Sequence, residues 1–453
     1  MVEAQTIERL KRHVELSNEE ALQNELNSMH SADIAEVFDN ITPEERLKYF
    51  EYLNLEKAAD LLEELTPQMQ VELLGAIDEE KSSKIISQMP HDSLADFLGD
   101  LSDEEVNTYL NRLPRRLSSQ IRELLSYPED TAGGIMTTEY LYVYENMTVE
   151  ETFTYIRSKA ETNIDFYYMY VVDKEDHLLG VLSLRSLLSS PLNAKVGSIM
   201  TTDVFKVTAT DEQEYVADSL IKYGYLALPV VDEFNRLKGI VTWDDAHYVN
   251  EEETTEEIYA SSGISTGLVD EDEILTGKIR LAIRARAPWL FITLLGAFGA
   301  VNVANHFEGI LHQLPVIAIF IPLLIGLGGN IGTQSVTLMV RGLSTGQVSM
   351  NSALHHIFRE FKVGLIIGLI FGILVMLVTW NWKNNVVLGG VVGIAMAANM
   401  AIATILGTAS PFILKRIGVD PAIASGPFIA TAIDIVGLAV YFILVTMSLR
   451  FLI

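Results

Sequence analysis

One carboxylate lies deep inside an apolar stretch of this sequence. Asp434 sits in the run GPFIATAIDIVGLAVYF, and the five long apolar segments hold no Lys or Arg away from their ends. A charged side chain in a membrane span costs at least ~2.5 kcal/mol, so an acid in such a position is functional by default. Asp434 must therefore be protonated, hydrogen-bonded to a neighbouring helix, or facing water and a passing cation. The pattern indicates a cation site, with a neutral helix–helix hydrogen bond as the alternative.

A second unusual group of residues lies in PLLIGLGGNIGTQSVTLMVRGL. Gly326, Gly328, Gly329 and Gly332 surround Asn330 there. Glycines at this density let helices approach closely, or let the backbone open beside a cavity. The sequence leaves both readings open, and Asn330 is a candidate pore residue in either.

Residues 244–277 form an acidic stretch that becomes a polar connector, DDAHYVNEEETTEEIYASSGISTGLVDEDEILTG. If the first part is helical, Glu253, Glu256 and Glu257 share one face, because spacings of three and four make side chains neighbours. Three carboxylates on one face repel one another unless a cation or a basic group meets them. The stretch is predicted to couple the soluble half to the membrane, and the alternative is a solvated linker.

The charge of the chain divides near residue 278. Residues 1–277 hold 56 acidic and 21 basic residues, a net of −35, whereas residues 278–453 hold 4 acidic and 11 basic residues, a net of +7. An acidic half of this size excludes nucleic acid as a partner and attracts cations. The chain has no cysteine, which excludes disulfides and thiolate chemistry, and no cleaved signal peptide is expected.

Residues 30–125 carry a hydrophobic period of twelve. Apolar residues recur at positions 29, 41, 53, 65, 77, 89, 101 and 113, and from position 41 each precedes a helix-starting or turn residue. The sequences beginning at Thr42 and Ser102 fit a capping box, in which a Glu three residues later returns a hydrogen bond. The period predicts short helices of about two turns stacked into a superhelix, an architecture without a catalytic signature.

Two related units follow. IMTTEYLYVYENMTVEETFTYI, from Ile135, matches IMTTDVFKVTATDEQEYVADSLI, from Ile199. Each copy reads as strand, helix, strand, turn, strand and helix. The pair resembles a tandem of cystathionine-β-synthase (CBS) domains, which associate face to face and often bind adenine nucleotides or metal ions.

The apolar half contains five segments, each long enough to span a bilayer, which needs ~20 residues. They are residues 287–305, 314–340, 362–382, 386–414 and 421–449. Glu360 is expected in a cytoplasmic loop, Glu308 in an external one and Asp420 at the cytoplasmic end before the last segment. With the N-terminus inside, nine basic residues are cytoplasmic and two, Lys383 and Arg450, are outside. The distribution predicts a cytoplasmic N-terminus and an external C-terminus.

The order of these segments, with SYPEDTAGGIMTTEY, GLGGNIGTQS, GVDPA and PFIATAIDIVG, resembles the MgtE-type magnesium channels over nearly the full chain. The expected fold is that of a multidomain membrane protein. It comprises an all-α superhelical domain (1–130), α/β tandem CBS domains (131–250), an acidic connecting or plug helix (246–277) and an α-helical transmembrane pore bundle of five helices (278–453). The resemblance implies a homodimer in the cell inner (plasma) membrane that conducts Mg²⁺ and closes when cytosolic Mg²⁺ binds the acidic domains.

The resemblance also implies functional positions in the pore and in the sensor. Asp434 matches the pore carboxylate that holds hydrated Mg²⁺, Ala430 lines the same site one turn earlier, and Asn330 completes the expected pore set. The positions expected to bind regulatory Mg²⁺ are Asp92, Asp96, Glu212, Glu214, Asp245, Glu253, Glu256, Glu257 and Asp420. The chain departs from the family at Gly224 and Tyr248, where acids are expected, and at Gly426, where the family often has Asn.

Nucleotide binding follows from the resemblance to CBS modules. Tyr225 could stack an adenine, Arg185 could meet phosphates and Asp245 could hold a ribose, although Ser186 replaces the corresponding Asp in the first copy. ATP is thereby a candidate regulatory ligand.

Three other functions compete with this prediction. Other divalent cations such as Co²⁺ or Mn²⁺ could be the cargo. A CBS-regulated anion channel would need cationic or N–H sites in its spans, where the lone deep charge is negative. A sensor that uses the spans as an anchor needs neither the glycine-rich segment nor Asp434. An enzyme is not expected, because no nucleophile–base pair or phosphate-cradling loop is visible.

Overall fold

The computed structural model describes residues 2–16, 18–159, 168–265, 274, 279–419, 421 and 426–452. The chain divides into two compact units, Met1–Glu251 and Glu252–Ile453. Each unit is described by itself.

The first unit begins with short helices that follow the predicted period. From α2 to α10, each helix begins twelve residues after the one before it. Their bounds are α1 Val2–Glu15, α2 Glu19–Ser28, α3 Ser31–Asp39, α4 Pro43–Tyr52, α5 Leu55–Glu63, α6 Pro67–Ala76, α7 Glu79–Ile86, α8 His91–Gly99, α9 Asp103–Arg112 and α10 Arg115–Leu124. Glu45 accepts from the Thr42 backbone N–H at 3.1 Å, and Glu105 does the same for Ser102, so both predicted capping boxes are confirmed.

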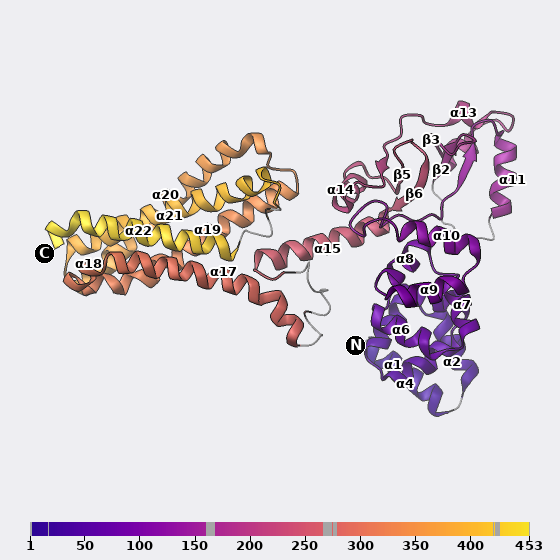
Figure 1. The fold of residues 1–453 in the computed structure, drawn as a ribbon, viewed down its shortest axis with the longest axis horizontal. Helices are drawn as coiled ribbons and strands as arrows, with labels where there is room; N and C mark the ends of the chain where they lie inside the picture. Colours follow the sequence, from indigo (N-terminus) through magenta and orange to yellow (C-terminus); the bar gives the residue numbers. More distant parts are fainter. Residues whose placement is uncertain are drawn as a thin grey trace. The chain divides into compact units, whose positions relative to one another are not determined.

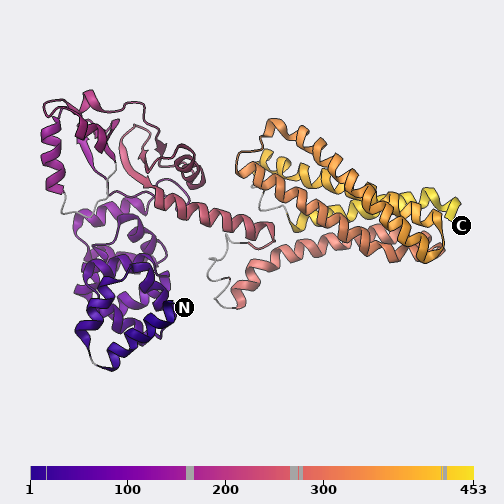
Figure 2. The same ribbon diagram turned by 180° about the vertical axis from the view of Figure 1, so that it is seen from behind.

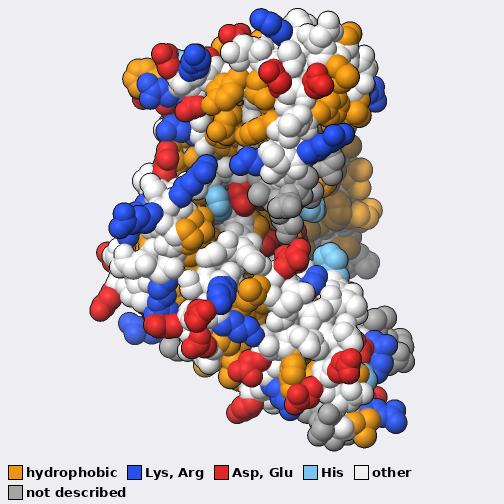
Figure 3. Space-filling view, turned by 90° about the vertical axis from the view of Figure 1, so that its right-hand side faces the viewer, with side chains coloured by type: hydrophobic (Ala, Val, Ile, Leu, Met, Phe, Trp, Pro, Cys, Tyr) orange, Lys and Arg blue, Asp and Glu red, His pale blue; other side chains and the backbone are white. Residues whose placement is uncertain are grey.

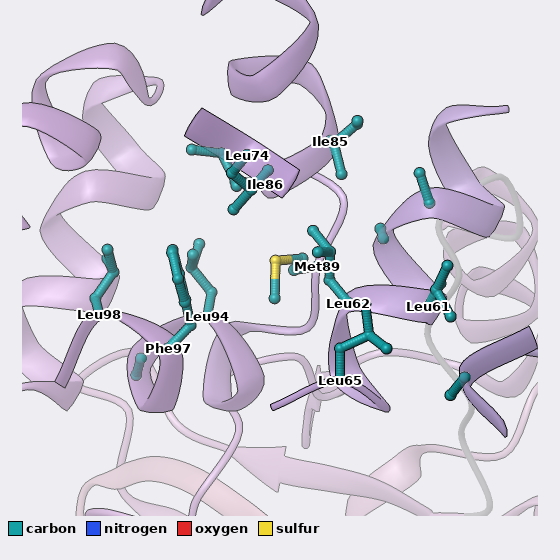
Figure 4. Packing of buried hydrophobic residues seen from close by; sticks show 14 of the residues in the cluster. Leu61, Leu62, Leu65, Leu74, Ile85, Ile86, Met89, Leu94, Phe97 and Leu98 are labelled. Atoms are coloured by element: carbon teal, nitrogen blue, oxygen red, sulfur yellow. The ribbon is translucent and has the colours of Figure 1, made fainter. Parts of the chain in front are cut away.

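The periodic apolar residues close each helix and enter the core. Leu65 and Met89, which follow α5 and α7, are buried beside Leu62 and Leu94 (Figure 4). The same hydrophobic cluster continues into the second CBS copy through residues such as Val230. The helical repeats and the CBS pair are therefore held in one unit by a shared core.

The two CBS copies each contain a three-stranded sheet. The first copy consists of β1 Tyr142–Tyr144, α11 Val149–Lys159, β2 Tyr168–Val172, β3 Leu178–Ser183 and α12 Leu184–Ser189, and α13 Val196–Ile199 precedes the second. The second consists of β4 Val207–Thr208, α14 Gln213–Tyr223, β5 Ala227–Val231, β6 Leu237–Thr242 and α15 Trp243–Ser261. In both sheets the first strand pairs parallel with the second and the second antiparallel with the third. The predicted order of elements is confirmed.

The two copies also exchange backbone hydrogen bonds. Thr137, which precedes the first sheet, bridges to Ile240 in β6, while Thr201, which precedes the second sheet, bridges to Val181 in β3. Each copy thus extends the sheet of the other.

The second unit contains five helices long and apolar enough to cross a membrane. Its elements are α17 Ile279–His306, α18 Glu308–Gln313, η1 Pro315–Phe320, α19 Ile321–Ser344, η2 Met350–Ser352, α20 Ala353–Lys383, α21 Val386–Arg416 and α22 Pro427–Leu452. The long helices lie side by side in both views (Figures 1 and 2). α21 packs against α19, α20 and α22, and α17 packs against α22, so the five predicted spans form one bundle.

The connecting segment is helical only in part among the residues that the structure describes. α15 begins in the second CBS copy and ends at Ser261. Residues 266–273 and 275–278 of the predicted 246–277 helix lie outside the described residues.

Candidate cation sites

Asp434 lies on α22, the last long helix, which begins at Pro427. A Cβ atom at Gly426 would lie 2.1 Å from the Ser261 carbonyl oxygen at the end of α15. Any side chain at position 426 would force these segments apart. The Asn that the family often has here is therefore excluded by a close backbone contact.

The Asp434 carboxylate is half-buried and faces α19. A Cβ atom at Gly329 would lie 3.9 Å from Asp434 Oδ1, so this glycine leaves open space beside the carboxylate. Ala430 is half-buried one turn earlier on α22, whereas Asn330 is exposed on α19. The structure thus brings Asp434 to the glycine-rich segment, and within the described chain it gives Asn330 no recorded contact with that carboxylate.

The glycine-rich segment is a continuous helix. α19 runs from Ile321 to Ser344 without interruption. Gly332 meets Ile433 of α22 and the Ala403 carbonyl of α21. Of the two readings left open by the sequence, close packing is the one that the structure supports, because the backbone does not open.

Asn399, on α21, is a buried amide at the same junction that the sequence analysis missed. Its Nδ2 donates to the Leu324 carbonyl of α19 at 2.8 Å. Its Oδ1 is buried with no hydrogen-bond partner in the described structure. Cβ atoms at Gly328 and at Gly437, three residues after Asp434, would lie 2.5 Å and 2.2 Å from this side chain. Asn399 therefore fills the space between α19 and α22 near the Asp434 site.

The expectation that Glu360 lies in a cytoplasmic loop is wrong. Glu360 belongs to α20, is 6% exposed, and lies 3.4 Å from the Ser335 hydroxyl of α19. The helix begins at Ala353, before the apolar segment, and Arg359 and Lys362 lie on its exposed face. The polar residues that suggested a loop are thus the solvent-facing side of a helix.

The acidic face on α15 meets a basic residue within the second unit. Glu257 lies 3.4 Å from the Arg341 guanidinium at the end of α19. Glu253 and Glu256 lie on the same face, and all three carboxylates are half-buried. Since one of the three is matched by a cation, the face is more than a solvated surface.

A group of carboxylates in the first unit gathers where α8 of the helical repeats approaches the CBS pair. Asp92 and Asp96 come from α8 and Asp245 from the first turn of α15, while Glu63 and Glu139 join them from α5 and the segment before β1. His91 fixes the junction, because its backbone N–H donates to Glu139 at 3.2 Å. The sequence analysis missed Glu63 and Glu139, since only the fold brings them to the predicted residues.

We call residues 63, 92, 96, 139 and 245 the acidic cluster. Repulsion between their carboxylates opposes the conformation that brings them together. Desolvation, followed by the neighbouring Asp92, raises the pKa of Glu63 to about 8 and that of Asp96 to about 7. Desolvation also raises the pKa of Asp92 and of Asp245, and each is affected by other acids nearby. Glu63 and Asp96 remain accessible to solvent, so water screens part of the repulsion and a cation can reach them.

Only some of the carboxylate oxygens in this cluster accept hydrogen bonds within the described structure. Asp245 Oδ2 accepts from the Thr242 backbone N–H at 3.2 Å and from the Thr242 hydroxyl. Asp92 Oδ1 is buried with no hydrogen-bond partner in the described structure. Asp92, Asp96 and Asp245 do not form a group with ligand atoms within 4.8 Å of one another. A single Mg²⁺ would therefore reach all three through water or after a small closure.

The remaining predicted regulatory positions are distributed over other elements. Glu212 and Glu214 are exposed at the start of α14. Asp420 lies outside the described residues. One unpredicted trio, Asp173, Glu175 and His177 in the turn after β2, is the group of potential metal ligands within 4.8 Å in the described structure, and Asp173 caps its own turn.

The three predicted nucleotide residues lie on separate elements of the CBS pair. Tyr225 stacks on Phe205, with ring centroids 6.3 Å apart, and is half-buried. Arg185 is exposed on α12 of the other CBS copy, and Asp245 faces the acidic cluster. The aromatic stack is the part of this prediction that resembles an adenine-binding surface.

The surface of the soluble part mixes all side-chain types. On the face shown in Figure 3, acidic, basic and hydrophobic side chains are interspersed. On that face the acidic side chains therefore do not form one continuous patch.

Family comparisons match three of the four predicted parts of the chain. A model described as MgtE, divalent cation transporter, matches residues 321–444, and one described as the MgtE intracellular N domain matches residues 29–130. The CBS domain model matches residues 132–193 and 196–251.

Individual proteins agree with these matches. The chain is 38% identical over 329 residues to the magnesium transporter MgtE of Thermus thermophilus, covering 72% of each chain. It is 34% identical over 334 residues to the magnesium transporter MgtE of Enterococcus faecalis, covering 74% of this chain and 72% of that one. A crystal structure of the cytosolic domain of the Mg²⁺ channel MgtE in complex with ATP is 35% identical, with a TM-score of 0.51, and covers 53% of this chain and 98% of that one.

Proposed function

We propose, since the chain belongs to the MgtE family, that it transports Mg²⁺ across a membrane past Asp434 and that cytosolic Mg²⁺ closes this path. The observation that carries the transport proposal is the half-buried Asp434 carboxylate beside Gly329 in a bundle of five candidate spans. Related proteins are named as magnesium transporters, which supports Mg²⁺ over Co²⁺ or Mn²⁺ as the cargo.

The chemistry of Mg²⁺ suits a pore with few protein ligands. Mg²⁺ gives up its octahedral waters reluctantly, so a pathway binds it through them, using one or two carboxylates. In a homodimer with the pore on its axis, two Asp434 side chains would face one hydrated ion, with Ala430 and Asn330 lining the same passage. The position of Gly329 supports this arrangement, because the glycine places no side chain beside the Asp434 carboxylate.

The acidic cluster supports a sensor of cytosolic Mg²⁺. Asp92, Asp96 and Asp245 repel one another at the junction of the helical repeats and the CBS pair. A divalent ion between them removes the repulsion, and so favours the conformation that brings them together. Glu212, Glu214 and Asp420 are proposed to serve the same role with the α15 face.

The connector supplies a route from sensor to pore. The end of α15 contacts the start of α22 at Gly426, and Glu257 of α15 reaches Arg341 of α19. Asp434 lies on α22 and faces α19, so a shift of α15 would be transmitted to that site through these two helices. We propose that Glu253, Glu256 and Glu257 bind Mg²⁺ in the closed state.

A regulatory nucleotide is a secondary proposal. The solved cytosolic domain of a related Mg²⁺ channel is in complex with ATP. Tyr225, with Arg185 and Asp245, would provide the contacts here, and binding of ATP would then modify the Mg²⁺ response.

The orientation of the chain is proposed from its charges. The basic residues at the helix ends favour a cytoplasmic N-terminus and an external C-terminus in the cell membrane. This topology places the acidic first unit in the cytosol, where it can report cytosolic Mg²⁺.

Flux through purified protein in liposomes tests the transport proposal. The wild type should take up Mg²⁺, and Asp434→Ala should lose at least about 90% of the flux while folding and assembling normally. Glu308→Gln, which neutralises an exposed carboxylate on α18, is the matched control and should transport normally. Normal Mg²⁺ flux through Asp434→Ala would remove the pore assignment. Uptake of Co²⁺ or Mn²⁺ in preference to Mg²⁺ would replace the proposed cargo.

A further inference from the structure

We propose that Glu360, Ser335 and Thr408 form a binding site for a monovalent cation inside the membrane unit. Glu360 lies on α20, Ser335 on α19 and Thr408 on α21, whereas Asp434 lies on α22.

The first observation is a buried carboxylate that lacks a cationic partner. Glu360 is 6% exposed, and no Lys, Arg or His nitrogen of the described residues lies within 4.0 Å of it. Its recorded neighbour is the Ser335 hydroxyl at 3.4 Å. A hydrogen bond from a hydroxyl to a carboxylate is usually about 2.5–2.7 Å long, so the bond that Ser335 donates to Glu360 is a long one. An unpaired buried charge is too costly to persist, and a bound cation would remove this cost.

The second observation is a buried hydroxyl without a partner on the facing helix. Thr408 is 0% exposed, and its Oγ1 has no hydrogen-bond partner in the described structure. Gly372 of α20 meets Gly393 of α21, and Gly364 meets Thr404. This antiparallel register, continued by one turn, places Glu360 opposite Thr408. On the third side, α19 contacts α21 where Gly332 meets Gly407, one turn from Ser335.

The charge of the site selects the class of ion. One carboxylate and two hydroxyls supply a single negative charge and oxygen ligands only. A monovalent cation would be neutralised there, whereas a divalent ion would leave a net positive charge in a buried, low-dielectric place. Mg²⁺ in particular would also have to give up most of its waters. The chemistry therefore points to Na⁺ or K⁺, which have the size and charge for such ligands.

Direct binding to the full chain in lipid nanodiscs tests the proposal. The background variant Asp434→Asn removes the pore carboxylate, so the result does not depend on Mg²⁺ transport or on its failure. With choline as the replacement ion at constant ionic strength, ²²Na⁺ should bind saturably at one ion per chain. The thermal midpoint should rise by about 5 °C when Na⁺ reaches 100 times its Kd. A parallel arm with K⁺ identifies which monovalent ion is preferred.

Variants separate the site from its surroundings. In the same background, Glu360→Gln should abolish Na⁺ binding and the Na⁺-dependent shift, whereas Glu308→Gln should retain both. If Glu360→Gln does not fold, Ser335→Ala and Thr408→Val keep the carboxylate, and each should weaken Na⁺ binding at least about tenfold. Three results would overturn the proposal: no saturable Na⁺ or K⁺ binding, binding that Glu360→Gln leaves unchanged, or a midpoint that responds to pH alone because Glu360 holds a proton.

Discussion

Carboxylates are arranged in opposite ways in the two units of the chain. The first unit gathers Asp92, Asp96 and Asp245 with Glu63 and Glu139 at one junction, where burial and mutual repulsion raise their pKa values. The described part of the second unit separates its deep acids, Asp434 on α22 and Glu360 on α20.

The difference indicates two different uses of the same functional group. Crowded carboxylates oppose the packed state until a cation joins them, so their conformation depends on the cation concentration. A single carboxylate beside open space binds a hydrated ion without stripping it, and so can release it again. The crowded arrangement suits sensing and the isolated one suits passage.

In the proposed mechanism, the contact between α15 and α22 couples the sensor to the pore, so its disruption should have the largest effect. Gly426→Ala places a methyl group 2.1 Å from the Ser261 carbonyl oxygen, so the end of α15 must move. We expect at least a tenfold higher cytosolic Mg²⁺ concentration for half-closure in patch recordings. Gly390→Ala, at a position with open space within 4 Å, is the matched control. An unchanged closure curve for Gly426→Ala would mean that this contact does not transmit closure.

The acidic cluster itself should respond to pH and to Mg²⁺ together. The pKa values of Glu63 and Asp96, about 8 and about 7, lie above their ordinary values. The protonated forms of Glu63 and Asp96 therefore favour the folded state. This contribution to the free energy of unfolding is fully present near pH 4 and is lost as pH rises through 7 to 8. In EDTA, the thermal midpoint of the soluble part, residues 1–277, should fall by about 2–4 °C over this range, and millimolar Mg²⁺ should restore it.

Removing the charges of Glu63 and Asp96 shows whether these two carboxylates cause the response to pH and Mg²⁺. The double variant Glu63→Gln with Asp96→Asn should flatten the pH dependence and remove most of the protection that Mg²⁺ gives against protease. Asp39→Asn, at an exposed position at the end of α3, should behave as the wild type. Equal proteolysis of the wild type with Mg²⁺ and with EDTA, at matched ionic strength, would count against a sensor role.

A smaller effect is expected from the amide that positions the pore helices. Asn399→Ala removes the hydrogen bond to Leu324, and such bonds in membrane bundles contribute about 0.6 kcal/mol on average. We expect a slightly lower thermal midpoint and a Mg²⁺ flux reduced two- to fivefold. Asn302→Ala is the matched control, because the recorded hydrogen bond of that exposed amide goes to Phe298 of the same helix. Equal flux in both variants would show that Asn399 does not position Asp434.

The sequence predicted those features that depend on local patterns. The period of twelve predicts helix starts throughout the repeats, because each turn residue can cap a helix regardless of the rest of the fold. The duplicated motifs predict both CBS sheets, and hydropathy predicts five spans. The helix start at Pro427 follows from the fixed φ of proline, which suits the first helical turn.

Features that depend on tertiary contacts were not predicted. Glu63 and Glu139 are distant from Asp92 in sequence, and only the packing of the repeats on the CBS pair joins them. Glu360 was placed in a loop because basic residues on the solvent face of α20 concealed its buried face. Asn399 lies deep in the apolar segment 386–414, which indicates a buried amide, but its partner Leu324 is distant in sequence and only the packing of α19 on α21 joins them.

The three carboxylates of α15 allow the most direct test of whether cytosolic Mg²⁺ closes the transport path. Glu253, Glu256 and Glu257 are replaced together by Gln, and Mg²⁺ is raised at the cytosolic face of inside-out patches. The wild type should lose its current as Mg²⁺ rises, because the ion stabilises the closed arrangement of this face. The triple variant should open normally and keep its current, since it has lost the ligands through which Mg²⁺ favours that arrangement. An unchanged inhibition curve in the triple variant would contradict closure through α15.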